Sequence, residues 1–133
     1  MKKLRILVVD DCLDLAQTLA RLLAEWGNEV TIAADGAQAL EAASVAQFDV
    51  AVLDLELPGM DGFEIAEKLR RLPGRALIHL IAMTGRSEDE WQRRVKEASF
   101  DHFLVKPVPP RHLKDLFQLY RPTDSGCEVD PDS

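Results

Sequence analysis

The chain has 133 residues, of which 47% are hydrophobic and 29% charged, and its formal net charge is −7 at pH 7. This length fits one globular domain with a core that needs no stabilising disulfide or metal. The acidic balance disfavours nucleic-acid binding, which relies on basic surfaces. Cys12 and Cys127 are predicted to be free thiols in a reducing compartment. No apolar run is long enough to span a membrane and the first residues make a poor signal peptide, so we predict a cytoplasmic location.

The first half of the chain alternates short apolar runs with amphipathic stretches. Residues 4–9 are almost entirely aliphatic, which is typical of a buried strand. The next apolar residues recur at helical spacing and define one face of a helix: Leu15, Leu19, Leu22, Leu23 and Trp26. Gly27 and Asn28 are expected to end that helix. Residues 29–33 predict a second strand, and Asp35 with Gln38 forms a capping box for a second helix.

The second half repeats this alternation. Strands are predicted at residues 48–53, 76–83 and 102–105. Helices are predicted from Asp61 to the Pro73-Gly74 stop, from Ser87 to about Ala98, and over residues 110–120. We therefore expect one domain over residues 1–120. Residues 121–133 are polar and acidic and are predicted to form a disordered tail.

Strands that alternate with helices predict a parallel sheet with helices on both faces. Sites in such α/β sheets form outside the carboxyl ends of the strands. Four of the predicted strands end in polar residues: Asp10-Asp11, Asp54, Thr84-Gly85 and Lys106-Pro107. We therefore expect three carboxylates, a hydroxyl and an ammonium group to converge on one edge of the sheet.

Three adjacent carboxylates repel one another unless a cation joins them. Mg²⁺ suits this set because it prefers oxygen ligands and uses one or two carboxylates together with a phosphate oxygen. The predicted ligands are Asp10, Asp11, Asp54 and the backbone carbonyl of Glu56. Taken alone, the acidic pair is equally typical of a helix cap formed by Asp11 or Asp14. The polar residues at the other strand ends favour the metal site.

Asp54 is the predicted nucleophile, because a carboxylate can attack phosphorus to give an aspartyl phosphate. Phosphoryl transfer needs an in-line nucleophile and positive charge around the equatorial oxygens. Lys106 would supply part of that charge, and Thr84 would donate its hydroxyl to a phosphate oxygen. In isolation, Lys106 is also typical of a surface lysine, and Thr84 of a threonine at the end of a strand. Their predicted roles therefore rest on their shared position with Asp54 at one edge of the sheet.

Together, these segments resemble the receiver domains of bacterial two-component response regulators over about residues 4–120. The matching segments are residues 8–11, Asp54 with residues 57–64, residues 83–85 and residues 103–107. The resemblance implies a flavodoxin-like (βα)5 doubly wound parallel sheet with strand order 2-1-3-4-5. It also implies that Asp54 is phosphorylated and that Thr84 and Lys106 contact the phosphoryl group. Asp10, Asp11 and the Glu56 carbonyl would then bind Mg²⁺.

The same resemblance implies partners. The donor would be a phosphohistidine on a histidine kinase or a histidine phosphotransfer protein, docking near Leu15. The output would use the fourth helix, fifth strand and fifth helix, and homodimers are compatible with the family. Such a domain catalyses only its own phosphorylation and dephosphorylation in a phosphorelay, and it contacts neither nucleic acid nor membrane directly. Whether it stands alone or belongs to a hybrid kinase is left open, with Met1 favouring the stand-alone form.

Several residues around the site carry further expectations from the resemblance. Phe103 would be the aromatic residue that rotates inward on phosphorylation. Glu56 and Arg86 would flank the site as a charged pair that gates water. The Lys106-Pro107 peptide bond would be cis. Trp91, near the start of the fourth predicted helix, would be either a core residue or an exposed partner contact.

Other functions fit the residues less well. A metal-dependent phosphatase with an aspartate nucleophile would place that residue on its first strand, whereas Asp54 follows the third. A flavodoxin-like flavin binder would need a phosphate loop where the chain has Asp10, Asp11 and Asp14, which would repel a phosphate. The main alternative is a pseudo-receiver that acts as a phosphorylation-independent protein-interaction module.

Overall fold

The computed structural model describes residues 4–57, 59, 61–74, 78–85, 89–98, 100–106 and 108–120, with the side chains of the last helix described as far as Phe117. The predictions for Arg86, Ser87, Pro107, Cys127 and the tail at residues 121–133 lie outside these residues.

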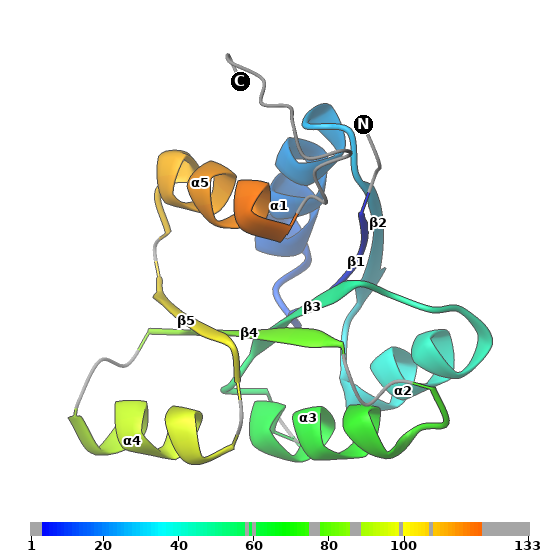
Figure 1. Ribbon diagram of the computed structural model, residues 1–133, viewed down its shortest axis with the longest axis vertical. Helices are drawn as coiled ribbons and strands as arrows, with labels where there is room; N and C mark the ends of the chain where they lie inside the picture. Colours follow the sequence, from blue (N-terminus) through cyan, green and yellow to red (C-terminus); the bar gives the residue numbers. More distant parts are fainter. Residues whose placement is uncertain are drawn as a thin grey trace.

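Strands and helices alternate along the chain (Figure 1). The strands are β1 (Arg5–Val9), β2 (Glu29–Ala33), β3 (Val50–Asp54), β4 (His79–Thr84) and β5 (His102–Val105). The helices are α1 (Leu13–Glu25), α2 (Gly36–Val45), α3 (Gly62–Arg71), α4 (Asp89–Glu97) and α5 (Pro110–Tyr120). Each predicted element is present. The bounds of two strands differ from the prediction: β3 starts at Val50 and β4 at His79, both later than predicted, and they end one residue later, at Asp54 and Thr84.

The strands form one parallel sheet in the predicted order β2-β1-β3-β4-β5. Val9 pairs with Leu53, Asp54 with Met83, and Thr84 with Val105 in the register of neighbouring strands. Because all strands run in the same direction, these pairs mark a single edge of the sheet. The residues that follow β1, β3, β4 and β5 therefore emerge side by side, as the sequence predicted.

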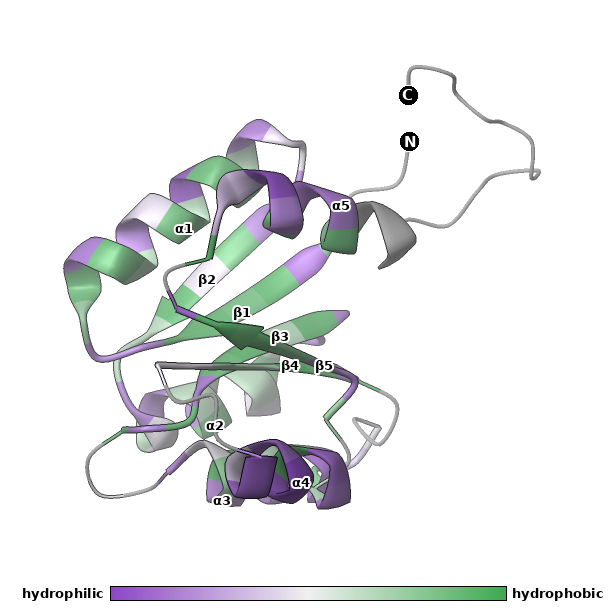
Figure 2. Ribbon diagram, turned by 90° about the vertical axis from the view of Figure 1, so that its left-hand side faces the viewer, coloured by the Kyte–Doolittle hydropathy of each residue, from purple (hydrophilic) through white to green (hydrophobic). Residues whose placement is uncertain are grey.

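Helices cover both faces of the sheet. Helices α1 and α5 lie on one face and α2, α3 and α4 on the other (Figure 1), and the apolar strands run between them (Figure 2). Ile6 and Val8 face α1 and α5, whereas Leu7 and Val9 face α2 and α3. This alternation follows from the two-residue period of a strand, and burial on both faces explains why β1 is aliphatic throughout.

Helix α1 corrects one detail of the predicted apolar face. Leu19 and Leu23 are buried, but Leu15 is 52% exposed, and Ala16 is buried instead. Ala16, Leu19 and Leu23 define the centre of the stripe that faces the sheet, and Leu15 lies at its margin. The helix ends where predicted: Gly27 has a φ of 92°, the left-handed conformation that favours glycine after a helix.

Two predicted side-chain caps are confirmed. Asp35 Oδ1 accepts a hydrogen bond from the Gln38 N–H at 2.8 Å, and Asp61 Oδ1 accepts one from the Glu64 N–H at 2.9 Å. In α2 the return bond differs from the predicted capping box, because Gln38 Oε1 accepts from the N–H of Ala34 at 2.8 Å. Each cap satisfies a backbone donor that the first turn of a helix leaves without an intrahelical partner.

Gly62 allows α3 to begin directly against the end of β3. A Cβ atom at this position would lie 2.8 Å from the backbone carbonyl oxygen of Asp54 and 2.8 Å from the Leu55 Cα. Because these are backbone atoms, an added Cβ could be accommodated only if β3 or α3 shifted. We expect Gly62→Ala to lower the free energy of unfolding by about 1–3 kcal/mol, measured by urea denaturation.

The matched control for that substitution is Gly85→Ala. An added Cβ at Gly85 meets nothing within 4 Å, so this change should alter stability by less than about 0.5 kcal/mol. Equal losses of stability in the two variants would show that the close backbone contact is not the reason why position 62 requires glycine.

Candidate functional site

Asp10 is the first residue after β1, and the backbone holds it firmly in place. Its N–H donates to the Ala33 carbonyl oxygen at 3.1 Å, and its side chain is almost fully buried. Asp10 Oδ1 accepts a hydrogen bond from the N–H of Cys12 at 3.0 Å, the local bond that short acidic side chains form in turns. Cys12 is the N-cap of α1 and makes no side-chain cap. The structure therefore does not support the alternative that Asp11 or Asp14 caps this helix.

Asp54 is the last residue of β3, and its side chain is also buried. Its Oδ1 accepts a hydrogen bond from the N–H of Glu56 at 2.9 Å, and the next residue, Leu55, extends the sheet by donating to the Met83 carbonyl oxygen at 3.0 Å. These bonds fix the orientation of the carboxylate before any ligand binds. The Glu56 side chain itself is exposed.

Lys106 brings a positive charge to both buried carboxylates. Its backbone N–H donates to the carbonyl oxygen of the buried Thr84 at 2.7 Å, which ties the end of β5 to the end of β4. Its Nζ lies 3.1 Å from Asp54 Oδ2 and 3.3 Å from Asp10 Oδ2. Asp10, Asp54 and Lys106 therefore meet at one point, as predicted, and Thr84 adjoins them through its backbone. The contact of the Thr84 hydroxyl with a phosphoryl group stays a prediction.

The three carboxylates of this site are close enough to share one metal ion. One oxygen from each of Asp10, Asp11 and Asp54 lies within 4.8 Å of the other two, and Asp11 is exposed on the solvent side. Among the described residues, these three carboxylates face one ammonium group, so this part of the site carries excess negative charge. Hard oxygen donors with uncompensated charge fit a hard divalent cation such as Mg²⁺. The role of the Glu56 carbonyl as a further ligand stays a prediction.

The surroundings of Asp10 and Lys106 raise the pKa of both groups, for different reasons. Burial raises the pKa of Asp10, with a further increase from Asp54, and the Cys12 N–H and Lys106 offset it only in part. For Lys106, burial opposes the charged form, but the hydrogen bond and charge of Asp54, together with Asp10, outweigh it and raise the pKa. Lys106 is therefore a permanent cation at neutral pH, whereas Asp10 carries an unfavourable buried charge.

An aromatic cluster lies against the same strand ends. Leu55, Ala82 and Val95 are buried, and the half-buried rings that pack on them are Phe63, Trp91, Phe100 and Phe103. The Trp91 ring stands edge-on to Phe63 with centroids 5.4 Å apart, so the structure favours the core interpretation of Trp91. The sequence did not predict this cluster, because its members come from several segments that are far apart in the chain.

Among the described helices, none is both long enough and apolar enough to cross a lipid bilayer.

Comparison with known proteins defines the class. The model of the response regulator receiver domain family matches residues 6–118. The chain belongs to this family, and it is thus a receiver domain of two-component signal transduction rather than a conventional enzyme. The parallel sheet in 2-1-3-4-5 order and the acidic pocket of Asp10, Asp11 and Asp54 agree with that membership.

Solved structures from bacteria are similar along nearly the whole domain. The chemotaxis protein CheY4 of Vibrio cholerae is 31% identical with a TM-score of 0.85, over 90% of this chain and 100% of that one. The receiver domain of the sensor histidine kinase PA1611 of Pseudomonas aeruginosa PAO1 is 25% identical with a TM-score of 0.80, over 90% of this chain and 98% of that one. That structure has a magnesium ion coordinated in its active site cleft.

A curated relative is longer than this chain. The cyclic di-GMP phosphodiesterase response regulator RpfG of Xanthomonas campestris pv. campestris is 33% identical over 128 residues, which cover 92% of this chain and 34% of that protein. The chain thus spans about a third of that relative's length.

Proposed function

We propose that Asp54 accepts a phosphoryl group from a phosphohistidine on a histidine kinase or histidine phosphotransfer protein. The observation that carries this proposal is the buried carboxylate at the end of β3, within 3.1 Å of the Lys106 ammonium group and grouped with two further aspartates. A fixed nucleophile beside positive charge is what phosphoryl transfer asks of a protein.

The metal would be Mg²⁺, held by Asp10, Asp11 and Asp54 with the carbonyl of Glu56. When bound, it supplies positive charge to the equatorial phosphoryl oxygens. The magnesium ion in the PA1611 receiver domain supports this assignment. The excess negative charge of the three carboxylates supports it independently.

Each protein group has a separate task in the transfer. An oxygen of Asp54 forms the new O–P bond while the P–N bond of the phosphohistidine breaks and its electron pair returns to the imidazole. The Glu56 N–H orients the Asp54 carboxylate. Lys106 contacts Asp10 and Asp54 in this structure. After the transfer, its ammonium group would bind an oxygen of the phosphoryl group. The Thr84 hydroxyl would donate to another oxygen.

Partner surfaces follow from the exposed apolar residues. Leu13 and Leu15, both about half exposed, lie on the first turn of α1 close to Asp11 and would receive the histidine donor. Val105, the last residue of β5, is partly exposed at 38% and would contribute to the output face. The switch role of Phe103, homodimer formation and the cytoplasmic location remain predictions.

Intact-mass measurement after incubation with Mg²⁺ and a small-molecule phosphodonor tests the proposal. We expect a gain of one phosphoryl group per chain, and no gain for Asp54→Asn or without divalent metal, because the variant keeps the shape but lacks the nucleophile. A protein that binds Mg²⁺ but gains no mass would instead be a pseudo-receiver that acts as a phosphorylation-independent interaction module. A gain that persists in Asp54→Asn would place the acceptor elsewhere.

A further inference from the structure

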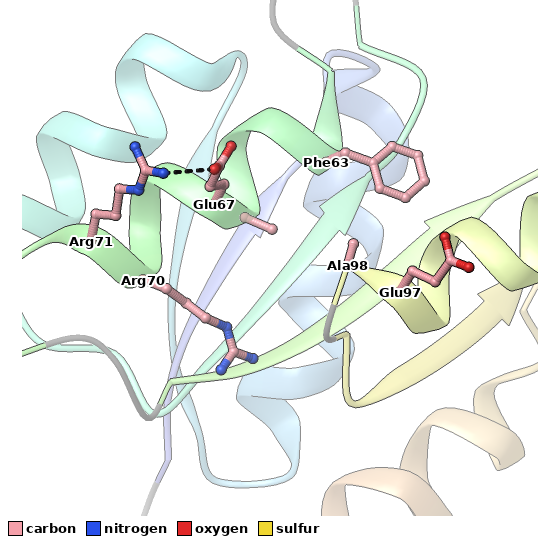
Figure 3. A pocket seen from close by; sticks show the side chains of 7 residues that line it. Phe63, Glu67, Arg70, Arg71, Glu97 and Ala98 are labelled. Atoms are coloured by element: carbon pink, nitrogen blue, oxygen red, sulfur yellow. Dashed lines mark hydrogen bonds and ion pairs between the residues drawn. The ribbon is translucent and has the colours of Figure 1, made fainter.

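A second concave site lies between α3 and α4, and none of the residues of the acidic site lines it (Figure 3). Its volume is about 470 Å³, which falls in the range of small-molecule sites. Phe63 and two alanines form the apolar part of the lining, and four charged side chains complete it: Glu67, Arg70, Arg71 and Glu97.

Most of these charges are already matched within the protein. Arg71 pairs with Glu67 at 2.8 Å, as the dashed line in Figure 3 marks. Arg70 pairs at 3.3 Å with Asp101, whose carboxylate also accepts the Leu80 N–H at 2.7 Å. In the described part of the chain, the Glu97 carboxylate makes no ion pair and no hydrogen bond. Among the described residues, the lining therefore offers one carboxylate without a counter-ion, on the exposed side chain of Glu97, and this carboxylate favours a positively charged ligand group.

The apolar part of the lining favours a ligand that also carries a ring. Phe63 is half-buried, and it already holds the Arg94 guanidinium 4.1 Å from its centroid. This contact shows that a planar cation can lie over the Phe63 ring, and a ligand cation at the same place would have to displace Arg94. Ala66 and Ala98 leave space beside it, since their side chains end at Cβ.

Phe63 also connects the pocket to the acceptor residue. It directly follows Gly62, whose N–H donates to the Leu55 carbonyl oxygen at 3.4 Å and whose backbone packs against that of Asp54. Phe63 and Leu55 belong to the same aromatic cluster. On the other wall, α4 contributes Val95 as its buried side chain, so α4 is held by few core contacts. A ligand that moves Phe63 would therefore displace the segment after Asp54.

We propose that the pocket between α3 and α4 binds a small organic cation, an amidinium or guanidinium group carried on an apolar ring, and that its occupancy changes the phosphorylation rate of Asp54. The first part stands on the pocket alone. The second part rests on the proposed phosphoacceptor function.

Binding is tested by titrating the ¹⁵N-labelled protein with benzamidine and following amide shifts. We expect shifts centred on Phe63, Glu97 and Ala98, and affinity about fivefold weaker in Glu97→Gln, which keeps the shape but loses the charge. Glu90→Gln is the matched control, because Glu90 is exposed on α4 outside the pocket. Benzoate should not bind. Equal affinity in both variants, shifts confined to other surfaces, or benzoate binding in place of benzamidine would overturn the assignment.

Coupling is tested by the initial rate of Mg²⁺-dependent phosphorylation with saturating benzamidine. We expect a change of about fivefold for the native protein, at the low end of allosteric couplings, and a smaller change in Glu97→Gln at the same concentration. An unchanged rate with the pocket occupied would overturn the coupling. If the protein gains no phosphoryl group even without benzamidine, the proposed function fails instead, and the binding titration still decides the site.

Discussion

Replacing Lys106 with methionine should lower the free energy of unfolding of the metal-free protein by about 2–4 kcal/mol. Asp10 and Asp54 are both buried. Among the residues that the structure describes, Lys106 is the cation that contacts both, with its Nζ 3.3 Å from Asp10 Oδ2 and 3.1 Å from Asp54 Oδ2. Methionine keeps most of the side-chain volume but removes the charge. The two carboxylates would then face each other with no counter-ion, which is the costly way to break a buried ion pair.

The measurement is urea denaturation at neutral pH, with and without Mg²⁺. Because the proposed metal position adjoins the same carboxylates, Mg²⁺ should stabilise Lys106→Met more than the native protein and recover part of the loss. Lys68→Met provides the control, since Lys68 forms an exposed pair with Glu64 at 3.8 Å that contributes little. A loss no larger than that of Lys68→Met would show that the ammonium group does not stabilise the buried pair.

The residues of the acidic site could be predicted because parallel strands bring their carboxyl ends to one edge. That rule predicts that Asp10, Asp54, Thr84 and Lys106 lie close together, and the contacts of Lys106 with the other three residues confirm it. The backbone donors that orient the carboxylates, the N–H groups of Cys12 and Glu56, carry no sequence signal. Every residue has an N–H group, so only the local turn shows which of them points at a carboxylate.

Contacts between helices could not be predicted from the sequence, for a different reason. The pairing of Phe63 with Trp91 joins residues on two helices whose relative position follows from how each packs on the sheet. Periodicity gives the apolar face of each helix but not which neighbour it meets. The exposure of Leu15 has a similar origin, because its position at the margin of the buried stripe depends on how α1 lies against the sheet.

Replacing Asp10 with asparagine should have the opposite effect to the Lys106 substitution, making the metal-free protein more stable at neutral pH by up to about 1 kcal/mol, because one buried carboxylate no longer ionises. The pKa of Asp10 is raised from 3.8, chiefly by burial and also by the charge of Asp54. The folded state therefore binds this proton more tightly than the unfolded chain does. As the pH rises from about 4 through the raised pKa, the native protein loses stability at this residue. Asparagine does not ionise, and its oxygen can still accept the Cys12 N–H.

Urea denaturation from pH 4 to pH 8 checks this sign. The advantage of Asp10→Asn should be smallest near pH 4 and grow as the pH rises, while the stabilisation by Mg²⁺ should largely disappear because a ligand is lost. Asp14→Asn, which changes an exposed acidic residue in the first turn of α1, should show neither effect. A constant advantage at every pH would mean that the buried charge is not its cause. Opposite changes in stability for Lys106→Met and Asp10→Asn would have one common cause, the excess of carboxylates over cations at the site. That excess lowers the stability of the metal-free fold, and it also favours binding of a divalent ion.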